Sequence, residues 1–198
     1  MPELTNAWDG EGPSLLQTAT KIIGKPFIYS EKDIPVFLCS AIPGWGLPLM
    51  VPVTPYLKTA NGSDTWDNFE FIDAVFHELL HMYVVRALRW NPRTDLLKKF
   101  GNEAIYTKIH LHLYALQKAV YLASNKGDWW ARTLKRTRGF GAEYQRAVDI
   151  VEQEGFEPFI KELKGEQSSG SISARPSLAS GSWVLALRKP LIDHRIEF

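Results

Sequence analysis

Apolar residues recur with the period of an α-helix over most of the chain beyond residue 66. The longest such pattern covers residues 66–90, and its central part, 75–83, is apolar apart from two histidines and one glutamate. A helix that is apolar on nearly every side is typical of a protein interior. Asn91-Pro92 ends the pattern, because the residue before a proline is disfavoured in the helical region. The sequence therefore predicts a long buried helix with three ionisable residues near its middle.

Shorter helical patterns lie on both sides of this helix. Residues 14–23 fit a short helix that follows a polar, glycine- and proline-rich lead-in at 1–14, which we expect to be irregular. Beyond the long helix, turns that contain glycine or asparagine separate the remaining helical segments. These predicted helices cover residues 101–124, 128–137, 142–154 and 157–163.

Three segments early in the chain are rich in the β-branched and aromatic residues that favour strands. They cover residues 27–30, 34–42 and 49–57. Prolines punctuate the last segment, and proline is tolerated only at sheet edges and bulges. The expected fold class is therefore α+β, with a small N-terminal sheet that has an edge strand, followed by a mainly helical core.

The composition changes to serine, glycine and proline over residues 165–182, which is typical of a flexible linker. A short apolar segment follows at 183–187. A length of 198 residues fits one domain with a tail. We therefore expect a folded domain at 1–164 and a flexible C-terminal tail at 165–198.

Composition narrows the classes of partner and site. The net charge of +1 gives no overall positive field, so nucleic acid is not expected as a partner. No apolar run reaches the ~18–20 residues that a membrane helix needs, so no membrane partner is expected either. The single cysteine, Cys39, excludes an internal disulfide and a cysteine-based zinc site. No signal peptide is visible at the start, so a cytoplasmic location is the default expectation and secretion stays open.

The ionisable residues of the long helix form an H-E-x-x-H motif at His77, Glu78 and His81. Residues four apart share one face of a helix, so both imidazoles can bind the same metal ion. Zinc accepts neutral imidazole nitrogen at ~2.0–2.1 Å. Glu78 lies about 100° further round the helix, where its carboxylate can take a proton from a zinc-bound water. The alternative is a core helix whose histidines bond to backbone carbonyls.

Residues 74–83 resemble the active-site helix of the HExxH zinc metallopeptidases, the zincins. The resemblance implies a zincin-like core that binds Zn²⁺, with His77 and His81 as zinc ligands and Glu78 as general base. Val84 and Ala87 stand where the metzincin subclass has glycine and histidine, so that subclass is excluded.

A catalytic zinc usually has three protein ligands and one open position. Similarity to the gluzincin subclass implies Glu103, a glutamate on the next helix. Helix rise favours His110, because His81 lies nine residues before the helix end at Trp90 and His110 lies nine residues into the returning helix. We prefer His110 as the third ligand and keep Glu103 as the alternative, either as a ligand or as a residue that holds a ligand imidazole.

Tyr106 shares one helix face with Glu103 and His110. Tyr106, Tyr83 and Tyr114 are candidate donors of a hydrogen bond to the oxyanion that develops on a substrate carbonyl, with a packed aromatic ring as the competing interpretation for each. Tyr106 is preferred because it shares the face of the candidate ligands. His112 lies about 200° from His110 and is interpreted as a core or helix-interface histidine.

Two functions fit these residues. The first is a zinc metallopeptidase that cleaves a peptide or protein substrate through a zinc-bound water activated by Glu78, with Tyr106 as a second catalytic residue. The second is a non-catalytic protein in which a structural zinc joins two helices. A structural site normally has four protein ligands, which His77, His81, Glu103 and His110 would supply.

Overall fold

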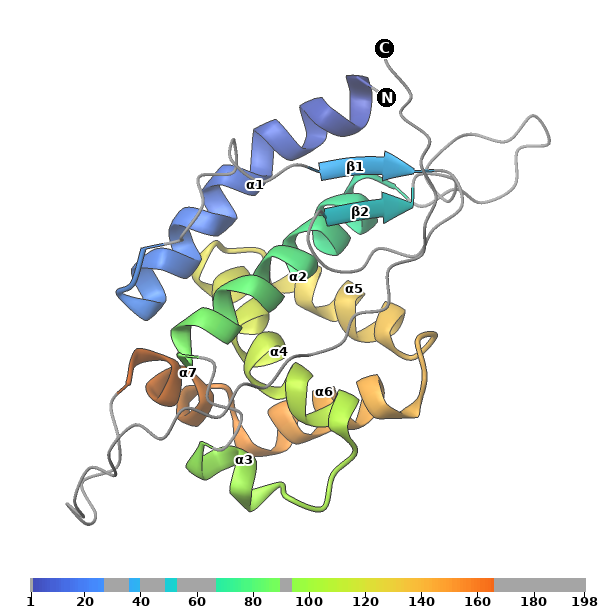
Figure 1. Ribbon diagram of the computed structural model, residues 1–198. Coiled ribbons are helices and arrows are strands. Elements are labelled where there is room, and N and C mark those ends of the chain that lie inside the picture. The colour runs from blue at the N-terminus through green and yellow to red at the C-terminus, as the bar shows by residue number, and fades with distance from the viewer. Residues whose placement is uncertain (1, 27–35, 40–48, 53–66, 90–93, 166–198) are drawn as a thin grey trace, which may run out of the picture. The chain divides into compact units, whose positions relative to one another are not determined.

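The computed structural model describes residues 2–26, 36–39, 49–52, 67–89 and 94–165 (Figure 1). All of them belong to the first of the two units into which the chain divides. The predicted tail lies outside the described residues except for Gly165, and so does the strand predicted at the start of the sheet.

Helices dominate the described part of the chain. The helices are α1 (Pro2–Ile23), α2 (Asn68–Ala87), α3 (Asp95–Lys99), α4 (Ile105–Ala123), α5 (Gly127–Thr137), α6 (Ala142–Glu154) and α7 (Glu157–Lys164). The strands β1 (Val36–Cys39) and β2 (Leu49–Pro52) pair in parallel, with Val36 opposite Leu49. No described helix combines the length and the apolar character needed to cross a lipid bilayer.

The α+β prediction is wrong, because the described fold is mainly helical and its strands are only four residues each. The rest of the segments predicted as strands at 34–42 and 49–57 lies outside the described residues. Strand propensity depends strongly on what a segment packs against. Among the described residues whose burial is known, the core is built by helices packed on helices.

The prediction of an irregular lead-in at residues 1–14 is also wrong, because α1 begins at Pro2 and continues through Pro13. The glycine and proline residues of this segment predicted an irregular chain, because their local helix propensity is low. Burial of an apolar face stabilises the helix in spite of them. Leu15 and Ala19 of this face are fully buried. Gly12 lets the Trp8 ring lie against the helix, because a Cβ there would be 2.3 Å from Trp8 Cε2.

A capping box fixes the start of α2. Asp67 accepts hydrogen bonds from the backbone N–H of Phe69 (2.8 Å) and Glu70 (3.2 Å), and Glu70 Oε2 accepts one from the Asp67 N–H (2.8 Å). Arg132 of α5 donates to both carboxylates, at 2.6 and 2.8 Å. The first turn of α2 is therefore tied to α5.

Helix α4 is at the centre of the core and contacts α1, α2, α5, α6 and α7, while α1 also lies along α2. The α2–α4 contact places the H-E-x-x-H helix against the helix that carries His110. His112 lies on another side of α4, where its Nε2 bonds to Glu162 of α7 at 2.6 Å. His112 is thus a helix-interface histidine, as expected. The largest fully buried side chains are Tyr114, Tyr121, Phe76, Phe159, Leu15, Leu79, Leu80, Leu111, Leu113, Leu116 and Ile150.

Candidate metal centre

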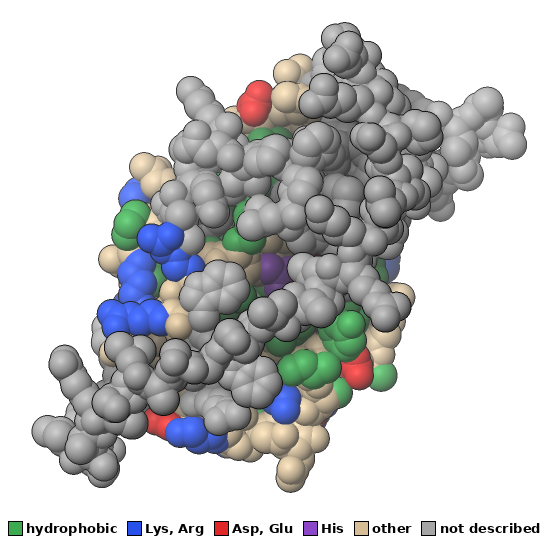
Figure 2. Space-filling model, in the orientation of Figure 1, with side chains coloured by type: hydrophobic (Ala, Val, Ile, Leu, Met, Phe, Trp, Pro, Cys, Tyr) green, Lys and Arg blue, Asp and Glu red, His purple; other side chains and the backbone are tan. Residues whose placement is uncertain are grey.

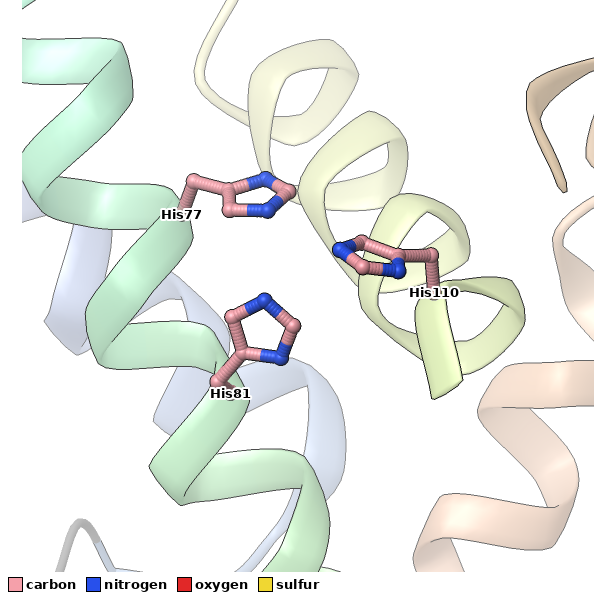
Figure 3. A group of neighbouring side chains, drawn as sticks. All are labelled: His77, His81 and His110. Atoms are coloured by element: carbon pink, nitrogen blue, oxygen red, sulfur yellow. The ribbon is translucent and has the colours of Figure 1, made fainter. Parts of the chain in front are cut away.

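Three histidine rings converge between α2 and α4 (Figure 3). One ring nitrogen from each of His77, His81 and His110 lies within 4.8 Å of the others. The ring centroids are 5.0 Å apart for His77 and His81, 5.4 Å for His77 and His110, and 4.8 Å for His81 and His110. Nitrogens that share one tetrahedral zinc lie roughly 3.3 Å apart, so closure by about 1.5 Å or less brings this donor set onto an ion.

Two of the rings are held by hydrogen bonds that leave one nitrogen free. His110 Nδ1 donates to the backbone carbonyl of Tyr106 at 2.6 Å, one turn earlier on α4. His77 Nδ1 lies 3.3 Å from Gln117 Oε1. Both contacts place the proton on Nδ1 and leave Nε2 as an acceptor, which is the state that a metal ligand requires.

Burial keeps the three histidines neutral. It holds the pKa of His77 well below the ordinary value, and repulsion from His81 and His110 lowers it further. Burial lowers the pKa of His81 to about 3, and it lowers that of His110 against the opposing hydrogen bond to Tyr106. Neutral imidazole binds metal, so the cluster does not need to lose protons first at neutral pH.

His77 and His81 remain partly exposed, while His110 is buried at 1% exposure. Figure 2 shows histidine atoms visible on one face of the molecule. His77 and His81 therefore keep some contact with solvent, which a site that exchanges water or substrate requires.

Glu78 follows His77 on α2, and the residue is partly buried. Burial raises the pKa of Glu78 to about 7, against the opposing effect of the Arg136 charge. A carboxyl group with a pKa near neutrality is suited to accept and return a proton at physiological pH.

Glu103 is placed differently from the histidines. It lies in the turn before α4, where its Oε1 pairs with Arg146 of α6 at 2.6 Å. This hydrogen bond, partly offset by desolvation, lowers the pKa of Glu103. Among the described residues, the convergent group contains the three histidines and does not include Glu103.

Tyr106 is exposed, with a relative exposure of 45%. Its ring stacks on Tyr144 of α6 at 6.4 Å, and Tyr144 in turn contacts His110 at 4.6 Å between centroids. Tyr144 is thus one ring closer to the cluster. Sequence spacing gave no signal for Tyr144, because its place depends on how α6 crosses α4.

Asp73 and Gln117 also lie next to the histidine cluster, and the H-E-x-x-H motif did not indicate them. Asp73 precedes His77 by four residues, and Gln117 follows His110 by seven, so each lies on the same helix face as a candidate ligand. These spacings were the only features of the sequence that could have indicated the two residues.

Comparisons with protein-family models, with curated proteins and with solved structures find no match to this chain. The resemblance to zincins therefore rests on the H-E-x-x-H motif.

Proposed function

We propose that the protein is a zinc-dependent hydrolase, most specifically a metallopeptidase. The observation that carries the proposal is the convergence of His77, His81 and His110 within 4.8 Å, with Glu78 next to His77 in the sequence. Three imidazoles on two packed helices match the donor type and number of a catalytic zinc site, which keeps a fourth position open.

The number of donors favours this function over a structural zinc that joins α2 and α4. A structural site needs a fourth protein ligand. Glu103, the predicted source of that ligand, is paired with Arg146. The described residues near the cluster therefore supply a three-ligand set.

Each side chain has a distinct role in the proposed reaction. A bound zinc ion supplies a Lewis acid that polarises a carbonyl group and acidifies water. Glu78 accepts the proton of the attacking water and returns it to the leaving amine. Tyr144, or Tyr106 as the sequence suggested, donates a hydrogen bond to the carbonyl oxygen as its negative charge develops.

Replacement of the proposed base separates binding from catalysis. Glu78→Gln should keep one zinc per chain, measured by native mass spectrometry, and should lose at least about a hundredfold in cleavage rate. Cleavage is measured on a mixture of proteome-derived peptides, with new termini identified by mass spectrometry. Glu157→Gln, an exposed glutamate on α7, is the matched control and should cleave at the wild-type rate.

Undiminished cleavage by Glu78→Gln would remove the proposed base. A zinc-loaded wild-type protein that cleaves no peptide, with a zinc sphere closed by four protein ligands in X-ray absorption spectra, would instead establish the structural role.

A further inference from the structure

A buried chain of polar contacts leads from the histidine cluster into the core between α2 and α4. Asp73 and Gln117 are its members, and neither is exposed to solvent. Asp73 lies one turn before His77 on α2, and Gln117 lies two turns after His110 on α4. The same two helix faces that present the histidines therefore present this pair behind them.

These polar contacts connect Asp73 to His77 through the Gln117 side chain. Gln117 Nε2 donates to Asp73 Oδ1 at 2.5 Å, and Gln117 Oε1 lies 3.3 Å from His77 Nδ1. Asp73 Oδ1 also accepts hydrogen bonds from Tyr121 (2.6 Å) and Thr133 (3.0 Å).

The Asp73 carboxylate also forms an ion pair with Arg136 of α5, at its other oxygen. Partners from α4 and α5 thus hold the carboxylate in place, and the nearby guanidinium balances its charge. A buried carboxylate requires such partners.

These contacts decide which nitrogen of His77 carries the proton. A carboxylate accepts hydrogen bonds and does not donate them, so the NH₂ group of Gln117 must face Asp73. The amide oxygen then faces His77, which places the ring proton on Nδ1. The Nε2 lone pair is left directed at His81 and His110 (Figure 3).

We infer that Asp73 and Gln117 form a positioning relay that fixes His77 in the Nδ1–H tautomer and orients its Nε2 toward a bound zinc ion. The inference rests on the proposed zinc site and adds two residues that act through His77 and do not touch the metal. A neutral amide between the carboxylate and the imidazole transmits this orientation and keeps the negative charge of Asp73 one residue away from the ligand.

Zinc affinity tests the relay directly. Gln117→Leu should raise the zinc Kd by about 10–100-fold, the usual effect of removing a group that orients a ligand. The Kd is measured by competition with a chromophoric chelator. His112→Leu is the matched control, because His112 is also buried on α4 and has a side-chain hydrogen bond, at 2.6 Å to Glu162, away from the cluster. That control should keep the wild-type zinc Kd even if it loses stability.

The tautomer provides a second readout that does not depend on any variant folding. Long-range ¹H–¹⁵N spectra of the wild-type protein should show the His77 proton on Nδ1 without zinc and with it. A His77 proton on Nε2 in the metal-free protein would overturn the relay. So would an unchanged zinc Kd in a folded Gln117→Leu variant while the wild-type protein binds zinc. Failure of the wild-type protein to bind zinc would overturn the proposed function together with the relay.

Discussion

At the scale of single residues, helix spacing led to the prediction that the three histidines lie together. His77 and His81 are one turn apart, and counting helix rise selected His110 over Glu103. The structure places His110 in the cluster and pairs Glu103 with Arg146. The contact of Tyr144 of α6 with His110 was beyond such reasoning, because it depends on a crossing angle that the sequence does not state.

The two candidate oxyanion donors make a prediction at this scale. Tyr144→Phe should reduce kcat of peptide cleavage by about a hundredfold, whereas Tyr106→Phe should reduce it less than about fivefold. The reason is that the Tyr144 ring contacts the His110 ring, while the Tyr106 ring is half exposed and stacks on Tyr144. Steady-state kinetics on one identified peptide measures both variants. The reverse order of effects would restore Tyr106 as the donor.

At the scale of elements, helices were predicted well where local signals define their ends. The segment 142–154 has the predicted bounds, because glycines flank it on both sides and end the helical pattern. The short helix α3 was missed, because five residues show too little periodicity to be seen. The long helix was expected over residues 66–90, whereas Asp67 caps α2 and the helix covers Asn68–Ala87.

The capping box of α2 should be measurable as stability. Asp67→Ala should lower the free energy of unfolding by about 1 kcal/mol, because it removes two hydrogen bonds to the first turn. Urea denaturation measures the change, with the exposed Asp95→Ala of α3 as a control expected to be close to neutral. The zinc Kd should stay at the wild-type value, since the cap is more than two turns from His77. Loss of zinc binding would show instead that the cap positions the site.

At the scale of the whole molecule, the mainly helical architecture was only partly predictable. The late helices follow from their periodicity, and α1 emerges because its apolar face is buried in spite of Gly12 and Pro13. Early strand propensity suggested a sheet that the described fold does not use as a layer. Long-range packing decided both points, and no local pattern in the sequence records it.

Zinc should stabilise the folded chain as a unit. At roughly a hundred times its Kd, zinc should raise the free energy of unfolding by about 2.7 kcal/mol, and Tm should rise by about 5–10 °C. Differential scanning calorimetry with zinc and then with excess EDTA measures the gain and its reversal. His81→Asn should show little gain, because it leaves two ligands. An equal gain in that variant would place the zinc elsewhere.

The metal-free protein should lose stability in mild acid. Burial lowers the pKa of His81 from 6.5 to about 3, so the unfolded chain binds more protons than the folded chain between these values. The contribution of His81 to the free energy of unfolding is therefore greatest above about pH 6.5 and falls as pH decreases toward 3. Urea denaturation at several pH values should show a shallower decline for His81→Asn. An equally steep decline would assign the loss to other groups.

One ammonium group joins three distant parts of the chain. Lys25, just after α1, donates to the last-turn carbonyls of Ala87 in α2 (3.1 Å) and Leu163 in α7 (2.5 Å). A positive charge is favourable at the C-terminal end of a helix, and here it serves two helices at once. Any shortened version designed for crystallisation or domain transplantation should therefore retain everything from α1 to α7. Removal of Lys25 or of α7 would break this link, which holds the C-terminal end of α2, the helix that carries His77 and His81.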